Sequence, residues 1–131
     1  MGLFDRFRKP AVTTTERVLV PNRAVRSGQL LQLESAILDV LDEMERLPAW
    51  LNPRWQAQAQ EFSHVIDVAR DLRARDYDWQ ELMDLAFEVR PVIKGGSTPE
   101  GMEHLVELQS TMMTLATALT TPREDEVQSE G

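Results

Sequence analysis

Four stretches of this chain repeat apolar residues every three to four positions. That spacing places the apolar side chains on one face of an α-helix, so each stretch predicts an amphipathic helix. Pro48, Pro91 and Pro122 follow three of these stretches, and proline does not fit inside a helix. The predicted helices are Gln29–Arg46, Pro53–Ala74, Trp79–Arg90 and Pro99–Thr121.

Residues with capping chemistry stand near the start of each predicted helix. Asn52 followed by Pro53 is typical of a capping residue followed by the first helical position. A capping box pairs a short polar residue with a glutamate three positions later. The other expected caps are Asp78 with Glu81, Ser97 with Glu100, and Ser27.

Short connections between the helices favour antiparallel neighbours. We therefore expect an all-α fold, an antiparallel four-helix bundle with up-down-up-down topology over residues 27–121. Residues 1–26 are expected to form a basic, partly extended N-terminal arm, because β-branched residues are frequent between its two prolines. A lone strand needs a partner. The Val18–Val20 run could therefore lie across the body or pair with another chain, or it could stay mobile. Residues 122–131 are expected to form a disordered acidic C-terminal tail.

Composition excludes several function classes. The chain has 131 residues, the usual size of one domain, and no cysteine, so disulfides, thiol nucleophiles and cysteine-ligated metals are excluded. The net charge is −8, and the acidic residues are concentrated in the predicted bundle. An acidic body repels phosphate, so we expect no nucleic-acid partner. No apolar run is long enough to span a membrane and no signal peptide is recognisable, which predicts a cytoplasmic protein.

Glu61 and His64 have the Glu-x-x-His spacing used by helical di-iron proteins. The second histidine, His104, has Gly101 where the matching glutamate would stand. At about 100° per residue, His64 also falls nearly opposite the core residue Phe62. We therefore expect a solvated surface histidine, with no metal and no cofactor.

Two other candidate sites have simpler explanations. Neighbouring acids such as Asp67 and Asp71 fall on predicted polar faces, where water screens them, so we expect no enzymatic activity. The segment Lys94–Thr98 places two glycines ahead of a predicted helix, a pattern that can bind an anion. The lysine precedes the glycines, however, unlike in a phosphate-binding loop. A turn between helices is the expected role of this segment.

Aromatic and apolar residues at predicted turns and off the core stripe indicate a binding surface. Trp50 and Leu51 lie in the first turn between helices, where an apolar pair is hard to bury. Phe87 lies about 140° from Leu82, off the main apolar stripe of its helix. These residues predict a non-enzymatic protein–protein interaction module, an adaptor or self-associating protein whose partner is another protein or a second copy in a homodimer. Trp50 is alternatively a plug for the end of the bundle.

The alternative function is peripheral membrane association through residues 1–9. As a helix, this segment would place Leu3, Phe4 and Phe7 on one side and basic residues around the other. Such a segment can insert apolar side chains into an anionic membrane surface. It could instead fold back over the bundle, dock into a partner groove or be disordered.

Overall fold

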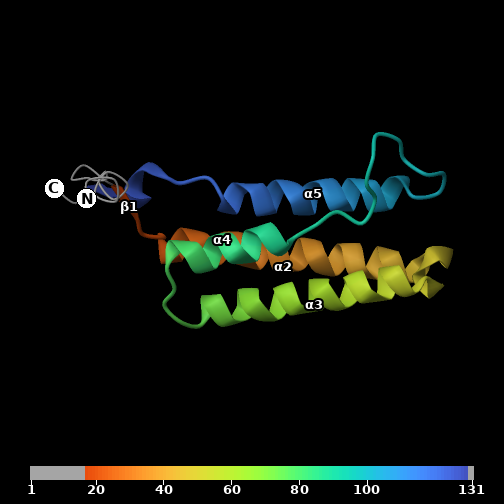
Figure 1. Cartoon of the computed structure of the whole chain (residues 1–131), viewed down its shortest axis with the longest axis horizontal. Coiled ribbons are helices and arrows are strands. Elements are labelled where there is room, and N and C mark those ends of the chain that lie inside the picture. The colour runs from red at the N-terminus through yellow and green to blue at the C-terminus, as the bar shows by residue number, and fades with distance from the viewer. Residues whose placement is uncertain (1–16, 130–131) are drawn as a thin grey trace, which may run out of the picture.

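The computed structural model describes residues 17–129 (Figure 1). Four helices account for most of this part of the chain, together with one small sheet of two strands, so the predicted all-α class is confirmed at this level. The helices are α2 (Arg23–Arg46), α3 (Pro53–Arg73), α4 (Trp79–Glu88) and α5 (Glu103–Leu119). The strands and single 3-10 turns are β1 (Arg17–Leu19), η1 (Pro48–Leu51), η2 (Glu124–Glu126) and β2 (Val127–Ser129).

The central helix of the fold is α2, which packs against both α5 and α3. The shorter α4 packs against α3 and α5 (Figure 1). The apolar stripes read from the sequence form one continuous core, to which all four helices contribute. Its largest fully buried apolar side chains are Phe62, Leu30, Leu33, Ile37, Met44, Leu72, Leu82, Leu85, Leu105, Met112 and Leu119.

The starts of α3 and α4 are where the local signals predict them. The Asn52 side chain accepts a hydrogen bond from the Arg54 amide at 2.9 Å, and Pro53 is the first helical residue. At α4, Asp78 Oδ1 accepts from the Glu81 amide and Glu81 Oε2 accepts from the Asp78 amide, which completes the capping box. These caps form between residues two or three positions apart, so the sequence alone reveals them.

The predicted start of the first helix was wrong. α2 begins at Arg23, six residues before Gln29, and its cap is Asn22 rather than Ser27. The Asn22 side chain accepts a hydrogen bond from the Val25 amide at 3.2 Å. Residues 23–26 therefore belong to the helix and not to an extended arm.

The predicted start of the last helix was also wrong. α5 begins at Glu103 instead of Pro99, and Ser97 does not cap it. Gly101 adopts φ +85° in a turn closed by a hydrogen bond from the Met102 amide to the Pro99 carbonyl, so the helix cannot extend upstream.

The loop between α4 and α5 is fastened by glutamine side chains. Gln109 of α5 accepts hydrogen bonds from the amides of Val92 and Ile93 and donates one to the Ile93 carbonyl. Gln58 of α3 donates to the Pro91 carbonyl at 3.0 Å. Beyond the end of α4, the loop is thus joined by hydrogen bonds to both α3 and α5.

The acidic tail is ordered as far as Ser129, which corrects the expectation of disorder for this part. Residues 124–129 form η2 and β2, and β2 pairs antiparallel with β1, with Val18 opposite Gln128. The partner of the Val18–Val20 run is therefore this chain's own C-terminal strand. In addition, the Val20 amide donates to the Glu126 carbonyl. The segment after α5 is thus part of the folded body.

Candidate functional site

Two of the three predicted anchor residues are exposed to solvent. Leu51 is 81% exposed at the end of η1, and Phe87 is 67% exposed near the end of α4. Both values are high for large apolar side chains in a domain with a continuous core. The two residues come from separate elements, and neither lines the grooves described below.

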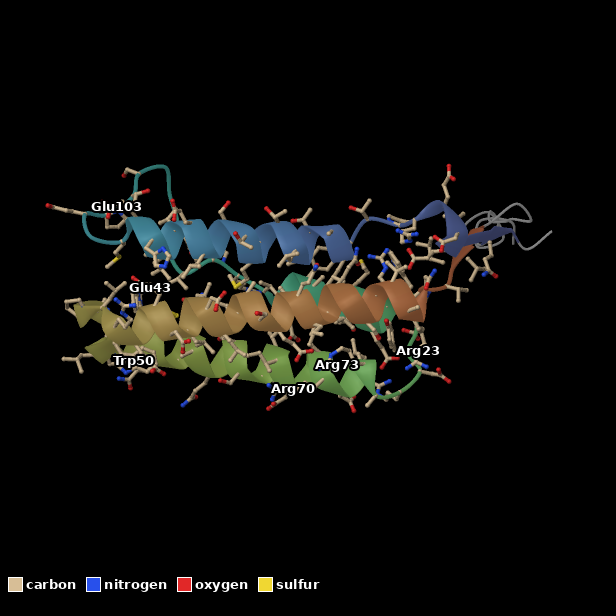
Figure 2. All side chains as sticks on the ribbon, turned by 180° about the vertical axis from the view of Figure 1, so that it is seen from behind. Arg23, Glu43, Trp50, Arg70, Arg73 and Glu103 are labelled. Atoms are coloured by element: carbon tan, nitrogen blue, oxygen red, sulfur yellow. The ribbon has the colours of Figure 1, made fainter. Side chains whose placement is uncertain are left out.

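The third predicted anchor, Trp50, is half-buried and packs against the core. It also lines a shallow groove of about 370 Å³ on the seam between α2 and α3. Figure 2 shows Trp50 at the end of the molecule where α2 turns into α3. The groove is lined by Leu41, Glu45, Trp50, Gln56, Ala59, Gln60 and Ser63. Trp50 therefore both contacts the core and borders an open groove.

A larger groove, of about 600 Å³, lies beside α3 and the end of α4. Glu61 and His64 line it together with Glu88, and His64 Nε2 is 4.0 Å from Glu88 Oε1. The side chains of His64 and Glu88 are 66% and 51% exposed, so water solvates both groups. Within residues 17–129 there is no cluster of three or more acids or histidines suited to hold a metal ion.

The glycine segment is not placed for anion binding at a helix end. Residues 94–98 are exposed and lie in the loop before α5. Because α5 begins only at Glu103, its amide groups are separated from Gly95 and Gly96 by a further turn. The segment serves as part of the connection between α4 and α5.

A buried ion pair between Arg26 and Glu126 is the main feature that the sequence analysis missed. Both side chains are fully buried, and Arg26 Nε donates to Glu126 Oε2 at 2.7 Å while Arg26 Nη2 donates to Oε1. The guanidinium also lies over the ring of Trp79, 5.4 Å from its centroid. The remaining hydrogen bonds from Arg26 reach Gln29 Oε1, the Ala118 carbonyl and the Thr121 carbonyl. The charge of Arg26 is thereby fully matched inside the protein.

Both carboxylate oxygens of Glu126 also have hydrogen-bond donors inside the protein. Besides Arg26, its carboxylate accepts hydrogen bonds from the backbone amides of Asn22 and Arg123. Burial by itself raises the pKa of Glu126, but the hydrogen bonds from Arg26 and the two amides outweigh it and lower the pKa to about 2. The carboxylate is therefore charged at neutral pH and fastens the C-terminal segment to the start of α2.

A second buried carboxylate, Glu34, joins α2 to α3. Arg73 donates to both of its oxygens, at 2.6 and 3.0 Å, and Arg70 donates at 3.3 Å. Figure 2 shows both arginines on α3. Hydrogen bonding to Glu34 raises the pKa of Arg73 above its usual value. Unlike the neighbouring acids predicted on polar faces, Glu34, Glu43 and Glu126 are buried.

One signal in the sequence could have revealed Arg26. It lies four residues before Leu30 and therefore on the core stripe of the same helix. Placing residue 26 in an extended arm concealed this relation. The partner of Arg26 is 100 residues away, so no local pattern could have identified Glu126.

The predicted membrane-contact residues Leu3, Phe4 and Phe7 lie outside the described residues. Among the helices that the structure describes, none combines the length and the apolar character needed to cross a membrane.

Comparisons with protein-family models, with curated proteins and with solved structures found no match for this chain.

Proposed function

We propose that this chain is a non-enzymatic interaction module that binds another protein through exposed apolar side chains. The observation that carries this proposal is the 67% exposure of Phe87 on a helix whose other large apolar residues contact the core. Aromatic side chains are the usual anchors of protein interfaces, because a partner pocket removes a large apolar area from water. Leu51, at 81% exposure, is the second anchor.

We further propose that α2–α5 form an up-down-up-down bundle that acts as a rigid support for these anchors. The contacts of α2 with α3 and α5, and of α4 with the same two helices, support this arrangement. A preorganised surface loses little conformational entropy on binding, which favours affinity. The partner that fits these anchors is another protein with an apolar pocket.

The test uses the full chain as an affinity bait in lysate of the native host, with bound proteins identified by mass spectrometry. Three variants are compared with the parent chain: Phe87→Ser, Leu51→Ser and, as a matched control elsewhere on the surface, Leu38→Ser, whose side chain is 43% exposed. We expect one protein to be retained by the parent chain and by the control in 1 M salt, because apolar contacts resist screening. Each anchor variant should retain it at least about tenfold more weakly.

Equal recovery on all four baits, or no protein recovered above the empty matrix, contradicts this proposal. Thermal unfolding of each variant separates lost binding from lost folding, since exposed substitutions typically change stability by less than about 0.5 kcal/mol.

Membrane association through residues 1–9 is the alternative, and the composition of that segment favours it. Its apolar side chains Leu3, Phe4 and Phe7 lie close in sequence to the bases Arg6, Arg8 and Lys9. Co-sedimentation with vesicles rich in anionic lipid tests this function. Binding that disappears on Phe4→Ser with Phe7→Ser supports it, and the absence of any binding removes it.

A further inference from the structure

The side of α2 that points away from the core carries two exposed leucines. Leu31 is 54% exposed and Leu38 is 43% exposed, and their spacing of seven residues is close to two helical turns. In Figure 2, α2 lies in front between α5 and α3, with α4 behind it, so no helix of the described chain covers this side. We call the exposed residues along this side the outer face of α2, and they are Ala24, Gly28, Leu31, Ser35 and Leu38.

Gly28 is not required by packing within residues 17–129. It lies inside α2, where glycine is less stable than alanine. A Cβ atom added to Gly28 would have no neighbour within 4 Å in the described chain. Glycine on a helix allows another backbone to approach closely. A second helix lying across the outer face of α2 therefore accounts for Gly28, whereas the single chain does not.

Large and small residues alternate on the outer face so that a second, antiparallel copy of α2 fits it. Gly28 and Leu38 are each five positions from residue 33, and Leu31 and Ser35 are each two positions from it. A two-fold axis at residue 33 therefore places Leu38 of one copy beside Gly28 of the other. The same axis places Leu31 beside Ser35. Each leucine meets a small residue, which allows the two helices to pack closely.

The charges beside the outer face favour the antiparallel direction. Arg23 lies at the start of α2 (Figure 2) and Glu45 lies near its end, and both are exposed. They fall within about 40° of each other around the helix, on the same flank of the outer face. An antiparallel pair brings Arg23 of each copy to Glu45 of the other, whereas a parallel pair brings like charges together.

The other charges at these two ends leave that pairing possible. Arg23 already contacts Asp76 at 2.6 Å, but Asp76 is 93% exposed, so this ion pair contributes little. The guanidinium has further donors for a second carboxylate. Arg46, next to Glu45, has its nearest carboxylate oxygen at 3.9 Å, on Glu43 of the same helix.

The available surface is large enough for a stable dimer. α2 has 24 residues and is therefore about 36 Å long. Packed helices lie about 9 Å apart, so the side formed by α5, α2 and α3 is about 25 Å wide. Its area is about 900 Å², and a stable interface buries about 800 Å² on each partner. A second copy of this chain is therefore an occupant of the right size.

We propose that the chain forms a symmetric homodimer in which the outer faces of α2 from two copies pack antiparallel. Leu31 and Leu38 lie at the centre of this interface, and Arg23 of each copy pairs with Glu45 of the other. Leu51 and Phe87 are not part of the outer face of α2. Dimerisation therefore goes beyond the proposed function, and the two use different surfaces.

The first test measures self-association of the full chain by sedimentation equilibrium over a range of concentrations. We expect the parent chain to form dimers and no larger species, since a two-fold contact closes on itself. Leu31→Ser and Leu38→Ser should each raise the dissociation constant at least about tenfold. Gly28→Gln should do the same, although glutamine is the better helix former, because its side chain keeps the helices apart.

Thermal unfolding at a concentration where the chain is monomeric checks that these variants fold. Gly28→Gln should not lower the unfolding midpoint there, since its Cβ meets no neighbour in the described chain. The matched control Phe87→Ser changes an apolar side chain that is more exposed than either leucine, and it should leave the dissociation constant unchanged.

A charge exchange tests the antiparallel direction. Arg23→Glu alone and Glu45→Arg alone place like charges together at both ends of the interface, so each should raise the dissociation constant about tenfold at low salt. An equal mixture of these two variants restores both ion pairs and should dimerise about as tightly as the parent chain. Asp76→Asn is the control, because it removes only the intramolecular contact of Arg23 and should leave dimerisation unchanged.

A parent chain that stays monomeric overturns this proposal, because the outer face is then free or covered by something other than a second copy. Dimers that remain equally tight in Leu31→Ser, Leu38→Ser and Gly28→Gln overturn it as well. A mixture no tighter than either charge variant alone overturns the antiparallel arrangement. Leu38→Ser should weaken dimerisation without affecting capture of another protein, and Phe87→Ser should do the reverse, so this proposal and the proposed function can fail separately.

Discussion

At the scale of single residues, buried charges decide how this chain is held together. Arg26 and Glu126 are fully buried, and each has all or nearly all of its hydrogen-bonding capacity used. Removing one member of such a pair leaves the other charge buried without a partner, which destabilises a protein far more than the pair itself stabilises it. The pair therefore makes the fold sensitive to single substitutions near its C-terminal end.

Glu126→Gln should lower the free energy of unfolding by about 3 to 5 kcal/mol, because it leaves Arg26 charged and without a counter-ion inside the protein. Denaturant unfolding at pH 7 measures this change. Glu124→Gln is the matched control, because Glu124 lies in the same 3-10 turn but is exposed, and it should change stability by less than about 0.5 kcal/mol. Similar effects of the two substitutions would contradict the role given to Glu126.

The same pair predicts how stability changes with pH. The pKa of Glu126 falls from 4.5 to about 2 on folding, so its contribution is fully present above about pH 4.5 and is lost as the pH falls towards 2. The loss should be roughly 3 kcal/mol. Unfolding measured at pH 7, 4.5, 3 and 2 should show this decline in the parent chain. Glu126→Gln should show a smaller decline between pH 4.5 and 2, and an unchanged decline would contradict the prediction.

At the scale of helices and loops, the sequence correctly predicted features that depend on residues close together in the chain. It did not predict features that depend on contacts between residues far apart in the chain. The starts of α3 and α4 follow from Asn52 and Asp78, whose capping bonds are local. The first turn of α2 depends instead on contacts of Asn22 and Arg26 with the C-terminal segment. Phe87 was recognised because helical geometry alone places it off the core stripe. The burial of Glu34 was not predicted, since its partners Arg70 and Arg73 lie on a different helix.

The start of α5 depends on one glycine. Gly101→Ala should lower the free energy of unfolding by about 1 to 2 kcal/mol, because φ +85° is unfavourable for a residue with a Cβ atom. Gly96→Ala is the matched control, since Gly96 has no positive φ and open space around its Cβ position. Thermal or denaturant unfolding compares the two variants. Equal stability of both variants would show that the turn at Gly101 does not fix the helix start.

At the scale of the whole molecule, the contacts that join the two outer segments of the described chain lie at one end, and the exposed Leu51 lies at the other. The sheet of β1 with β2 and the Arg26–Glu126 pair hold the two outer segments of the described chain together at one end (Figure 1). The exposed Leu51 lies towards the opposite end, where α2 turns into α3. Binding at that end would therefore leave the fastening contacts undisturbed.

Deleting residues 122–131 tests whether the C-terminal segment belongs to the cooperative fold. We expect the deletion to lower the free energy of unfolding by at least as much as Glu126→Gln, because it removes the same counter-ion together with β2. In a chain that already carries Arg26→Met, the deletion should have a clearly smaller effect, since Arg26 and the deleted Glu126 form one buried pair. Additive effects in denaturant unfolding of the four chains would show that the tail contributes independently of Arg26.

The pairing of Arg17 with Ser129 has a consequence for how the chain can be rearranged. A short Asn-Gly linker between these two positions would turn β1 and β2 into an ordinary β-hairpin and make the backbone a nearly closed ring. New ends could then be opened at Gly95–Gly96, in an exposed loop where a cut removes no buried contact. Such a circular permutant should keep the same helices in the same places, because the order in which they are connected is not what holds them together.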